Sequence, residues 1–344
     1  MPPRRRNLVL IYAESLEQTY GDSALFGRDL LADTRRLGGI SFPSYRGAKG
    51  ANWTIAGMVA TQCGVPLRTY AETDVRRRGS AKAFLPGATC IGELLQAQGY
   101  ENVFMGGAPL SFAGKGSFLR DHGYAERWGR DEWEDAGATA AEFNEWGLYD
   151  DRLYARAKTR LERLHASGRP FNLTLLTLDT HNPHGFLSPY CKSLGARAFD
   201  DIVACASRQI ADFVAFMEQK GYLENTTVVV LGDHLALRNP SFDKLQEAGA
   251  DRRVFNLFIT GPGARPMRDE LLPFDVYPTL VEMLGTQVEG HRLGLGYSAI
   301  AEVQAPPYDE HDDNSSLAAL RGSAAYDALW QPLPASAPGA NAPD

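Results

Sequence analysis

Residues 7 to 15 read NLVLIYAES, and residues 226 to 234 read TTVVVLGDH. Each stretch is a short apolar run that ends in a turn carrying an acidic side chain. Such runs are typical of central parallel strands, which are buried on both faces. Parallel strands deliver the residues that follow them to one edge of the sheet, and open α/β sheets bind ligands at that edge. We therefore expect Glu14, Asp233 and His234 to lie close together.

The rest of the chain alternates apolar runs with amphipathic helical segments. We expect strands at residues 7–13, 102–105, 171–179, 226–231 and 254–260, and helices at residues 88–98, 150–166, 199–219 and 275–284. This alternation predicts an α/β fold with a mostly parallel central sheet and helices on both faces. The segment from Pro332 onward is rich in Ala and Pro, which predicts disorder.

Composition and charge exclude several classes of protein. The net charge of −7 argues against a general nucleic-acid binder, which needs a basic face to neutralise phosphates. No apolar run reaches the ~20 residues that span a bilayer, and the amino terminus, MPPRRR, lacks the apolar stretch of a signal peptide. The chain as written is expected to be soluble. Arg4 to Arg6 are either a basic tail or the remnant of a linker that followed a membrane helix.

The four cysteines, at positions 63, 90, 191 and 205, fall in two groups that are local in sequence. An even number permits two disulfides, which would suit an oxidising compartment. Four free thiols are the alternative, and the residues alone favour neither.

Thr54 stands in GANWTIAGMVA, residues 50 to 60, where a turn of small residues leads into an apolar helix. In the first turn of a helix, unpaired backbone amides and the positive end of the dipole favour a phosphate or an alkoxide. An ordinary capping role is the alternative, and this segment alone favours it. With Glu14, Asp233 and His234, the Thr54 hydroxyl would complete a set of hard oxygen ligands and one nitrogen, which suits Mn²⁺, Mg²⁺ or Zn²⁺.

Residues 177 to 186, TLDTHNPHGF, close another buried strand with a polar loop. His181 is placed to donate to a phosphoryl oxygen or to shuttle a proton. His184 could do the same or lie on the surface, and the intervening Pro183 favours the surface. Lys115, in FAGKG at residues 112 to 116, offers a point charge for phosphate, although a lone lysine in a Gly-rich loop is usually only solvated.

Together these segments resemble one family, the phosphoglycerol transferases that decorate periplasmic glucans, related to the lipoteichoic acid synthases within the alkaline phosphatase and sulfatase-like superfamily. The resemblance spans residues 7 to about 300. It is carried by NLVLIYAESLE (7–17), TIAGMVA (54–60), QCGVPL (62–67), FAGK (112–115), DTH (179–181), GF (185–186), DHLA (233–236) and LGLG (293–296). It implies a sulfatase-like catalytic domain over residues 7–300 and a partly disordered extension over residues 301–344.

The resemblance also implies roles for individual residues. Glu14, Thr54, Asp233 and His234 would bind one divalent ion, expected to be Mn²⁺, with Thr54 as the nucleophile. His181 would lie beside the substrate phosphate.

Further substrate contacts are implied in the same way. Lys115 would contact the phosphoglycerol, and His184, which stands where close relatives carry an acidic residue, would contact the acceptor differently. The resemblance pairs Cys63 with Cys90 and Cys191 with Cys205 as disulfides.

The implied reaction transfers phosphoglycerol from phosphatidylglycerol, or from a decorated glucan, to hydroxyls of a periplasmic β-glucan through a covalent phosphoglyceryl-threonine. The implied location is the periplasm, with access to the membrane surface. In the family a membrane-spanning segment that this chain lacks tethers the domain to the inner membrane. Ala113 stands where the teichoic acid enzymes carry a Trp, which disfavours polyglycerol phosphate synthesis. The sequence does not indicate an oligomeric state.

Several alternatives remain. Phosphoethanolamine transfer and hydrolysis of phosphodiesters are compatible with the same ligands. A sulfatase would carry a Cys/Ser-x-Pro-x-Arg motif, which Thr54 and the residues after it do not match, and a two-zinc phosphatase would need a second set of Asp and His ligands. A non-catalytic glucan-binding module would have lost some of the proposed ligands. Stacking on sugar rings and core packing account equally well for Trp53, Trp128, Trp133 and Trp146.

Overall fold

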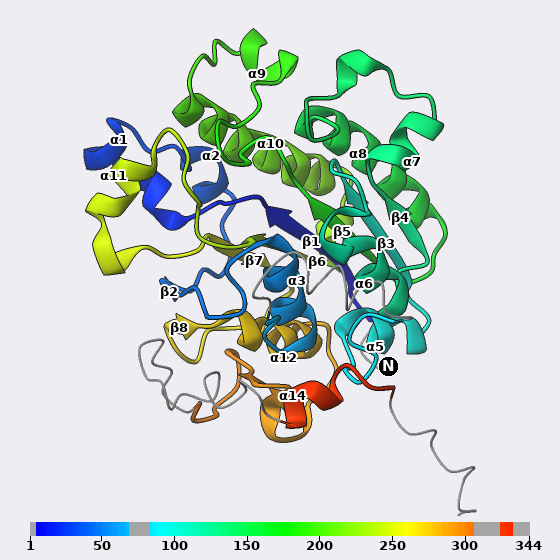
Figure 1. Ribbon diagram of the computed structural model, residues 1–344. Helices are drawn as coiled ribbons and strands as arrows, with labels where there is room; N and C mark the ends of the chain where they lie inside the picture. The colour runs from blue at the N-terminus through cyan, green and yellow to red at the C-terminus, as the bar shows by residue number, and fades with distance from the viewer. Residues whose placement is uncertain (1–4, 69–82, 306–323, 333–344) are drawn as a thin grey trace, which may run out of the picture.

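The computed structural model describes residues 5–68, 83–305 and 324–332 of the chain. A six-stranded sheet crosses its centre in the order β4-β3-β5-β1-β6-β7 (Figure 1). These strands are β1 (Asn7–Ala13), β3 (Glu101–Gly106), β4 (Glu126–Trp128), β5 (Phe171–Leu176), β6 (Thr226–Gly232) and β7 (Asn256–Ile259). Within this sheet β7 runs antiparallel to β6, and every other neighbouring pair is parallel. The predicted α/β fold with a mostly parallel central sheet is therefore confirmed.

Helices cover both faces of the sheet, as Figure 1 shows. One face packs against α3 (Thr54–Cys63), α5 (Ile91–Ala97), α6 (Lys115–Asp121) and α12 (Pro273–Met283). The other packs against α8 (Asp150–Ala166) and α10 (Phe199–Gln219). Side chains of a strand alternate between its faces, so Leu8 and Leu10 of β1 enter the first core while Val9 and Ile11 enter the second. All four are fully buried, as the unbroken apolar run predicts.

Smaller elements complete the described chain. The short helices are α1 (Ser23–Phe26), α2 (Ala32–Arg35), α7 (Arg130–Asp135), α9 (Pro189–Ser193), α11 (Phe242–Glu247) and α14 (Ala324–Ala328). Two-residue strands form the pairs β2 (Ser44–Tyr45) with β8 (Glu270–Leu271), and β9 (Arg292–Leu293) with β10 (Gly296–Tyr297). No helix in the described ranges is both long enough and apolar enough to cross a bilayer.

The strand expected at residues 171–179 ends earlier than its apolar pattern suggests. β5 stops at Leu176, because the backbone amides of Leu178 and Asp179 donate to the carboxylate of Asp150 instead of to a neighbouring strand. The loop that carries His181 therefore begins three residues sooner. The short strand β4, which is three residues long, was not predicted.

Part of the segment expected as an extension packs against the body of the protein. Tyr326 of α14 is buried and its hydroxyl accepts a hydrogen bond from the backbone of Arg68, while Trp330 contacts Phe84 with ring centroids 5.4 Å apart. Residues 306–323 and 333–344, on which the expected disorder falls, lie outside the described residues. The domain boundary at residue 300 stays a prediction.

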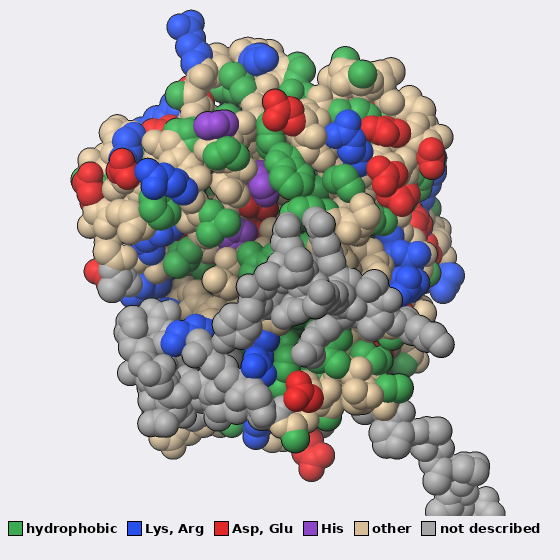
Figure 2. All heavy atoms as spheres, in the orientation of Figure 1, with side chains coloured by type: hydrophobic (Ala, Val, Ile, Leu, Met, Phe, Trp, Pro, Cys, Tyr) green, Lys and Arg blue, Asp and Glu red, His purple; other side chains and the backbone are tan. Residues whose placement is uncertain are grey.

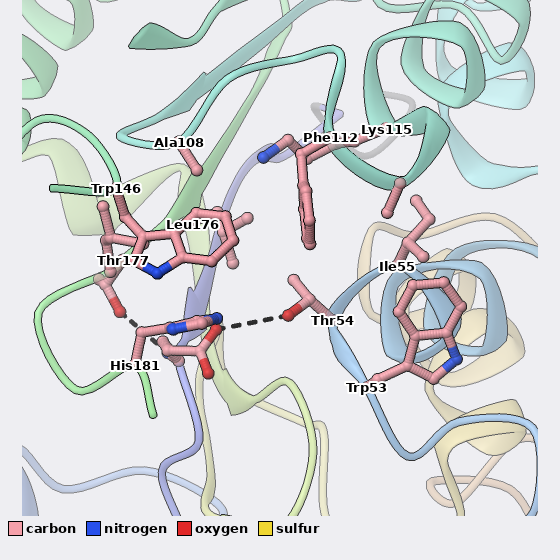
Figure 3. Close-up of a pocket in the computed structure, with 13 residues that line it drawn as sticks. Trp53, Thr54, Ile55, Ala108, Phe112, Lys115, Trp146, Leu176, Thr177 and His181 are labelled. Carbon is pink, nitrogen blue, oxygen red and sulfur yellow. Dashed lines mark hydrogen bonds between the residues drawn. The ribbon is translucent and has the colours of Figure 1, made fainter. Parts of the chain in front are cut away.

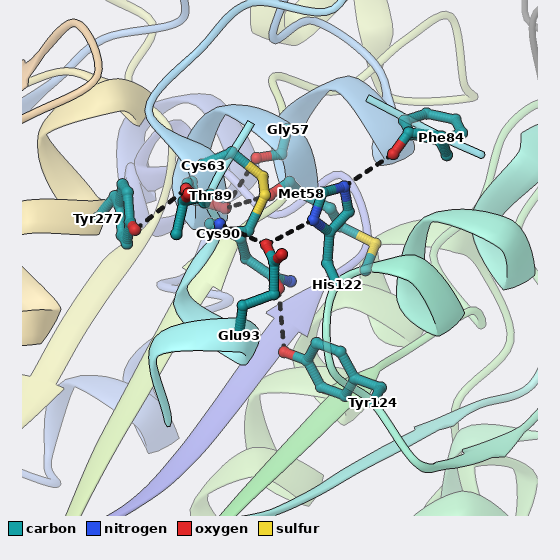
Figure 4. The surroundings of a disulfide bond; sticks show 12 residues. Gly57, Met58, Cys63, Phe84, Thr89, Cys90, Glu93, His122, Tyr124 and Tyr277 are labelled. Carbon is teal, nitrogen blue, oxygen red and sulfur yellow. Dashed lines mark hydrogen bonds and ion pairs between the residues drawn. A yellow bond between two sulfur atoms is a disulfide. The ribbon is translucent and has the colours of Figure 1, made fainter. Parts of the chain in front are cut away.

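Both implied disulfides are formed. Cys63 bonds to Cys90 and Cys191 bonds to Cys205, with Cα atoms 4.2 and 5.9 Å apart. The first joins the last residue of α3 to the residue that precedes α5, beside the partly buried contact between Glu93 and His122 (Figure 4). Because Thr54 opens α3, the helix that carries this candidate nucleophile is covalently anchored at its other end.

Candidate active site

Four of the candidate residues meet at the carboxyl edge of the sheet. Glu14 follows β1, Asp233 and His234 follow β6, and Thr54 is the first residue of α3. His234 Nε2 lies 3.5 Å from Asp233 Oδ2 and 3.8 Å from Glu14 Oε1, and Thr54 Oγ1 lies 3.4 Å from Glu14 Oε2. The expected convergence is confirmed, while the roles of these residues stay a prediction.

The surroundings of this cluster leave ligand atoms free. The ring Nδ1 of His234 donates to the carbonyl of Leu235 at 2.8 Å, so Nε2 faces the carboxylates. Asp233 Oδ1 accepts from the amides of Ser15 and His234, but Oδ2 is buried and has no hydrogen-bond partner. A buried carboxylate oxygen without a partner is costly, which points to a ligand that completes it.

The charges of the cluster point the same way. Burial and the neighbouring Glu14 raise the pKa of Asp233 to about 7. Burial acts to lower the pKa of His234, but the carboxylates of Asp233 and Glu14 outweigh it, and the pKa is raised. A cation between these groups would stabilise both carboxylates in their charged form.

The spacing of the donors fits a divalent cation. Ligand atoms about 2.1 Å from a cation at tetrahedral angles lie about 3.4 Å from one another. The separations of 3.4 to 3.8 Å between donor atoms of Glu14, Thr54, Asp233 and His234 are close to this spacing. Oxygen ligands with one imidazole suit Mn²⁺, Mg²⁺ or Zn²⁺, so the residues fit the implied ion without choosing among the three.

A second cluster of potential ligands, Cys90, Glu93 and His122, does not form a metal site. The sulfur of Cys90 is in the disulfide, and both ring nitrogens of His122 are engaged, with Glu93 and with the carbonyl of Phe84 (Figure 4). Within the described residues, the Glu14 cluster is thus the one group with ligand atoms to spare.

Thr54 does not cap its helix. The residue at the N-cap is Trp53, whose side chain makes no capping bond, and the Thr54 hydroxyl points away from the helix toward Glu14. The capping role that the segment alone favoured is therefore wrong. The amides of the first turn of α3 stay open at the site, which favours a bound phosphate.

The approach of α3 to the cluster depends on Gly57. A Cβ atom at this position would lie 2.1 Å from the carbonyl oxygen of Asp233, so a side chain would push the first turn of α3 away from the end of β6. The sharp turn after β1 is similarly constrained, because Ser15 adopts a positive φ of 53° directly after Glu14. Strained backbone of this kind is concentrated at functional sites.

We expect Gly57→Ala to lower the affinity for Mn²⁺ by about tenfold or more, because it separates Thr54 from Asp233. Isothermal titration calorimetry would measure this. Gly92→Ala is a matched control, since a Cβ there would meet the carbonyl of His122 at 2.2 Å, far from the cluster. The control should lower stability and leave the Mn²⁺ affinity of the folded protein unchanged. Equal affinities for Gly57→Ala and the unaltered protein would show that this close approach does not position the ligands.

A small, partly open cavity lies beside Thr54. The ring of Trp146, the amine of Lys115 and the hydroxyl of Thr54 point into it, and Phe112 and His181 line it (Figure 3). Seen from outside, acidic and histidine side chains lie at the bottom of a hollow framed by hydrophobic ones (Figure 2). The cavity therefore combines an apolar wall with a few converging polar groups, as small-molecule sites do.

His181 and Lys115 both belong to this cavity. The Nδ1 of His181 donates to the carbonyl of Asn182 at 2.6 Å, which leaves Nε2 available, and burial lowers the pKa of this ring. Lys115 is 4% exposed, and burial lowers its pKa to about 8 against the opposing effect of Glu14. The expectation that a lone lysine here is only solvated is therefore wrong.

His184 lies outside the cavity, on the exposed part of the same loop. The loop folds back on itself, since the amide of Gly185 donates to the carbonyl of His181 and that of Phe186 donates to the carbonyl of Asp179. This turn directs residues 182 to 184 to the surface, as the alternative for His184 anticipated. Its substrate contact has no support in this geometry.

The tryptophans divide between site and core. Trp53 and Trp146 line the cavity, whereas Trp128 and Trp133 stack on one another with centroids 4.5 Å apart beside α8.

Two threonines that were not predicted as site residues hold Glu14 in place. The hydroxyl of Thr177 accepts a hydrogen bond from the backbone amide of Glu14, and the hydroxyl of Thr180 donates one to the backbone carbonyl of Glu14. Nothing in the sequence distinguishes these threonines from others in the chain.

An open, mostly parallel sheet with a helix-terminal hydroxyl beside two carboxylates and an imidazole defines the class of α/β proteins with the alkaline phosphatase and sulfatase fold. The chain belongs to the sulfatase family, whose family model matches residues 6–286.

The chain is also similar to individual proteins. It shares 37% identity over 328 residues with phosphoglycerol transferase I of Xanthomonas campestris pv. campestris (strain B100), which covers 93% of this chain and 45% of that relative. With phosphoglycerol transferase I of Escherichia coli O127:H6 it shares 36% identity over 316 residues, covering 88% of this chain and 40% of the relative. The chain thus spans less than half the length of these curated relatives.

The fold is shared with the lipoteichoic acid synthase LtaP from Listeria monocytogenes. The TM-score is 0.66 at 17% identity, and the match covers 82% of this chain and 72% of that one.

Proposed function

We propose that this domain transfers phosphoglycerol from phosphatidylglycerol, or from a decorated glucan, to hydroxyls of a β-glucan through a covalent phosphoglyceryl-threonine at Thr54. The observation that carries the proposal is the placement of the Thr54 hydroxyl, at the open end of α3 and 3.4 Å from Glu14, beside an Asp233 oxygen that has no hydrogen-bond partner. The similarity to two phosphoglycerol transferases at 36–37% identity supports this choice of transferred group.

Glu14, Thr54, Asp233 and His234 would hold one divalent ion, which we expect to be Mn²⁺. When bound, the ion would supply positive charge that favours an ionised threonine oxygen and stabilises the phosphoryl group. The protein contributes the geometry, since Ser15, Leu235 and the turn after β6 orient the ligand side chains.

The transfer takes two in-line displacements. In the first, His181 Nε2 takes the proton of Thr54 as the threonine oxygen forms a bond to phosphorus. The bond from phosphorus to the diacylglycerol oxygen breaks, and His181 passes the proton to that oxygen. In the second, His181 Nε2 takes the proton of a sugar hydroxyl as its oxygen attacks phosphorus, and passes it to the departing threonine oxygen. Thr54 and His181 are then restored.

The cavity favours transfer to a sugar over transfer to water. Lys115 places a buried positive charge beside the phosphoglycerol, and Trp146 and Phe112, with ring centroids 5.0 Å apart, cover it with an apolar wall. Excluding water strengthens the electrostatic interactions inside the cavity and limits hydrolysis of the threonine ester.

We place the reaction in the periplasm, at the surface of the membrane that supplies the lipid donor. Two disulfides suit an oxidising compartment, and the similar phosphoglycerol transferases support a lipid donor and a glycan acceptor. The complete set of oriented ligands favours an enzyme over a glucan-binding module. Thr54 in place of the sulfatase Cys or Ser motif disfavours sulfate ester hydrolysis.

The proposal is tested by incubating the protein with phosphatidylglycerol labelled in its head group, a β-glucan and Mn²⁺, with a chelator control. Mass analysis of the glucan and of the peptide that contains Thr54 should find an added phosphoglycerol on both. Free glycerol phosphate with an unmodified glucan would identify a hydrolase instead. An added phosphoethanolamine from the matching lipid, with no phosphoglycerol transfer, would change the assigned group.

We expect kcat/KM to fall as the pH rises through about 8, because Lys115 must be protonated to attract the phosphate and burial places its pKa there. The sign follows from the charge, since a lysine is positive below its pKa and neutral above it. Initial rates between pH 6 and 10 would measure this fall in kcat/KM. Lys115→Arg should move the fall to higher pH. A fall at the same pH in the variant would assign the titration to another group.

A further inference from the structure

Two buried carboxyl groups that the proposed reaction does not use lie behind the cavity. Asp150 and Asp179 are each 1% exposed. Asp150 opens α8, and its two oxygens accept hydrogen bonds from the backbone amides of Leu178 and Asp179, at 2.7 and 3.0 Å. Asp179 returns the contact, since its Oδ2 accepts from the amide of Asp150 at 3.3 Å. The two residues thus tie the start of the His181 loop to the first turn of α8.

A third side chain extends this connection to the opposite wall. Asn144 reaches Asp179 Oδ1 with its amide nitrogen at 3.5 Å, and its own oxygen accepts from the amides of Trp146 and Gly147, at 2.8 and 2.9 Å. Asn144 therefore shapes the turn that carries Trp146. We call Asp150, Asp179 and Asn144 the loop clamp.

The two side chains that the loop clamp supports are in contact inside the cavity. The ring centroids of Trp146 and His181 lie 4.9 Å apart, and His181 is two residues beyond Asp179, with its amide bonded to the carbonyl of Leu178. None of the three clamp residues lines the cavity. They act on it only through the two backbone segments that they hold.

Holding acidic groups at this position is costly. Burial raises the pKa of Asp150 to about 7 and raises the pKa of Asp179 well above its usual range, with the neighbouring Asp150 adding to the effect on Asp179. Burial therefore opposes the charged form of both carboxyl groups. Fully connected buried polar groups of this kind specify one local arrangement.

We propose that the loop clamp is a positioning element for the transfer reaction, which holds His181 and Trp146 in fixed contact so that His181 Nε2 meets the departing and attacking oxygens. This inference rests on the proposed function for its kinetic consequence. Its structural consequence, a fixed His181 ring, can be measured without activity. Because proton transfer requires hydrogen-bond reach, a displacement of about 1 Å is enough to cost up to roughly 10²-fold in rate.

The test replaces Asp150 by Asn, which leaves one acceptor for two backbone donors. We expect kcat per Mn²⁺-binding site to fall about 10- to 100-fold, with a smaller change in Mn²⁺ affinity, because the loop clamp reaches the ligand Glu14 only indirectly, through Thr177 and Thr180. Asp151→Asn, at the next position of the same first turn, is the matched control and should leave kcat unchanged. In a His181→Ala background, Asp150→Asn should cause no further loss, since residues acting through one group are not additive.

A spectroscopic measurement makes failure of this inference distinguishable from failure of the proposed function. The ring resonances of His181, assigned with His181→Ala, should shift in Asp150→Asn and remain in place in Asp151→Asn, whether or not the protein transfers phosphoglycerol. If Asp150→Asn does not fold, Asn144→Ala takes its place; it removes the bond to Asp179 and the two bonds that shape the Trp146 turn, and leaves the bonds between Asp150 and Asp179 intact. Unmoved His181 resonances, or losses that add fully to His181→Ala, would overturn the positioning role.

Discussion

Thr54→Ala is expected to lower the rate of phosphoglycerol transfer by roughly 10⁴-fold or more, because it removes the atom proposed to form the covalent bond to phosphorus. The fold should remain, since the Thr54 hydroxyl makes only a long hydrogen bond of 3.4 Å to Glu14 and a contact with Asp233, and loss of one such bond costs about 1 kcal/mol or less. Transfer of labelled phosphoglycerol measures the first effect, and thermal unfolding measures the second.

Two companion variants make the Thr54 result specific. Thr54→Ser keeps a hydroxyl at the open end of α3 and should retain part of the activity, with phosphoglycerol found on the serine by mass analysis. Val59→Ala, further along the same helix, buried in the core and outside the lining of the cavity, should retain full activity. Transfer at an undiminished rate by Thr54→Ala would remove Thr54 from the mechanism and leave direct attack by the sugar as the route.

Asp233→Asn is expected to change the stability of the protein in opposite directions with and without metal. In the absence of metal, the carboxylates of Asp233 and Glu14 are buried side by side, and Asp233 Oδ2 has no hydrogen-bond partner. Burial raises the pKa of Asp233 to about 7, so at pH 8 the ionised carboxylate opposes folding. Asn removes that charge and keeps an oxygen for the amides of Ser15 and His234. The metal-free variant should therefore be more stable, by on the order of 1 kcal/mol or more.

With metal bound, the Asp233→Asn variant should instead be less stable than the unaltered protein. Loss of one charged ligand is expected to lower the Mn²⁺ affinity by about 10²-fold or more, so a saturating concentration of Mn²⁺ stabilises the unaltered protein more than the variant. Urea unfolding at pH 8, with a chelator and with Mn²⁺, measures the free energy of unfolding of both proteins in each condition.

Asp275 supplies the matched control for this metal-dependent reversal of stability. It is also 4% exposed, but it pairs with Arg268 at 3.1 Å and accepts from the amides of Leu272 and Tyr297. Asp275→Asn should therefore lower stability to the same extent with and without metal. If Asp233→Asn destabilised the metal-free protein, or bound Mn²⁺ as tightly as the original, the assignment of Asp233 as a ligand would not stand.

Local patterns in the sequence were enough to predict the central strands and the ends at which the candidate ligands lie. The apolar runs before Glu14 and Asp233 can be satisfied only by burial on both faces, and parallel strands place their ends at one edge. Convergence of Glu14, Asp233 and His234 therefore followed from position in the chain. For the same reason the longer helices, such as α8 and α10, were predicted close to their observed bounds.

Position in the chain was not enough to predict which side chains line the cavity. The segment around Thr54 favoured a capping residue, and the loop around Lys115 favoured a solvated side chain, because each judgement used only nearby residues. The structure brings α3 against β6 at Gly57 and buries Lys115 at the start of α6, so distant segments decide both side chains. His184, by contrast, was correctly expected at the surface, since the turn that exposes it is local.

The amino-acid sequence by itself determined the α/β architecture, the edge at which chemistry is placed and the residues that could hold a divalent ion, because these depend on burial and strand direction along short stretches. Only the tertiary structure decided that Trp146 meets His181 and that Asp150 and Asp179 hold the loop between them. Those contacts join residues about 30 positions apart, and their energy arises from burial and hydrogen bonds that exist only once the sheet and α8 have packed together.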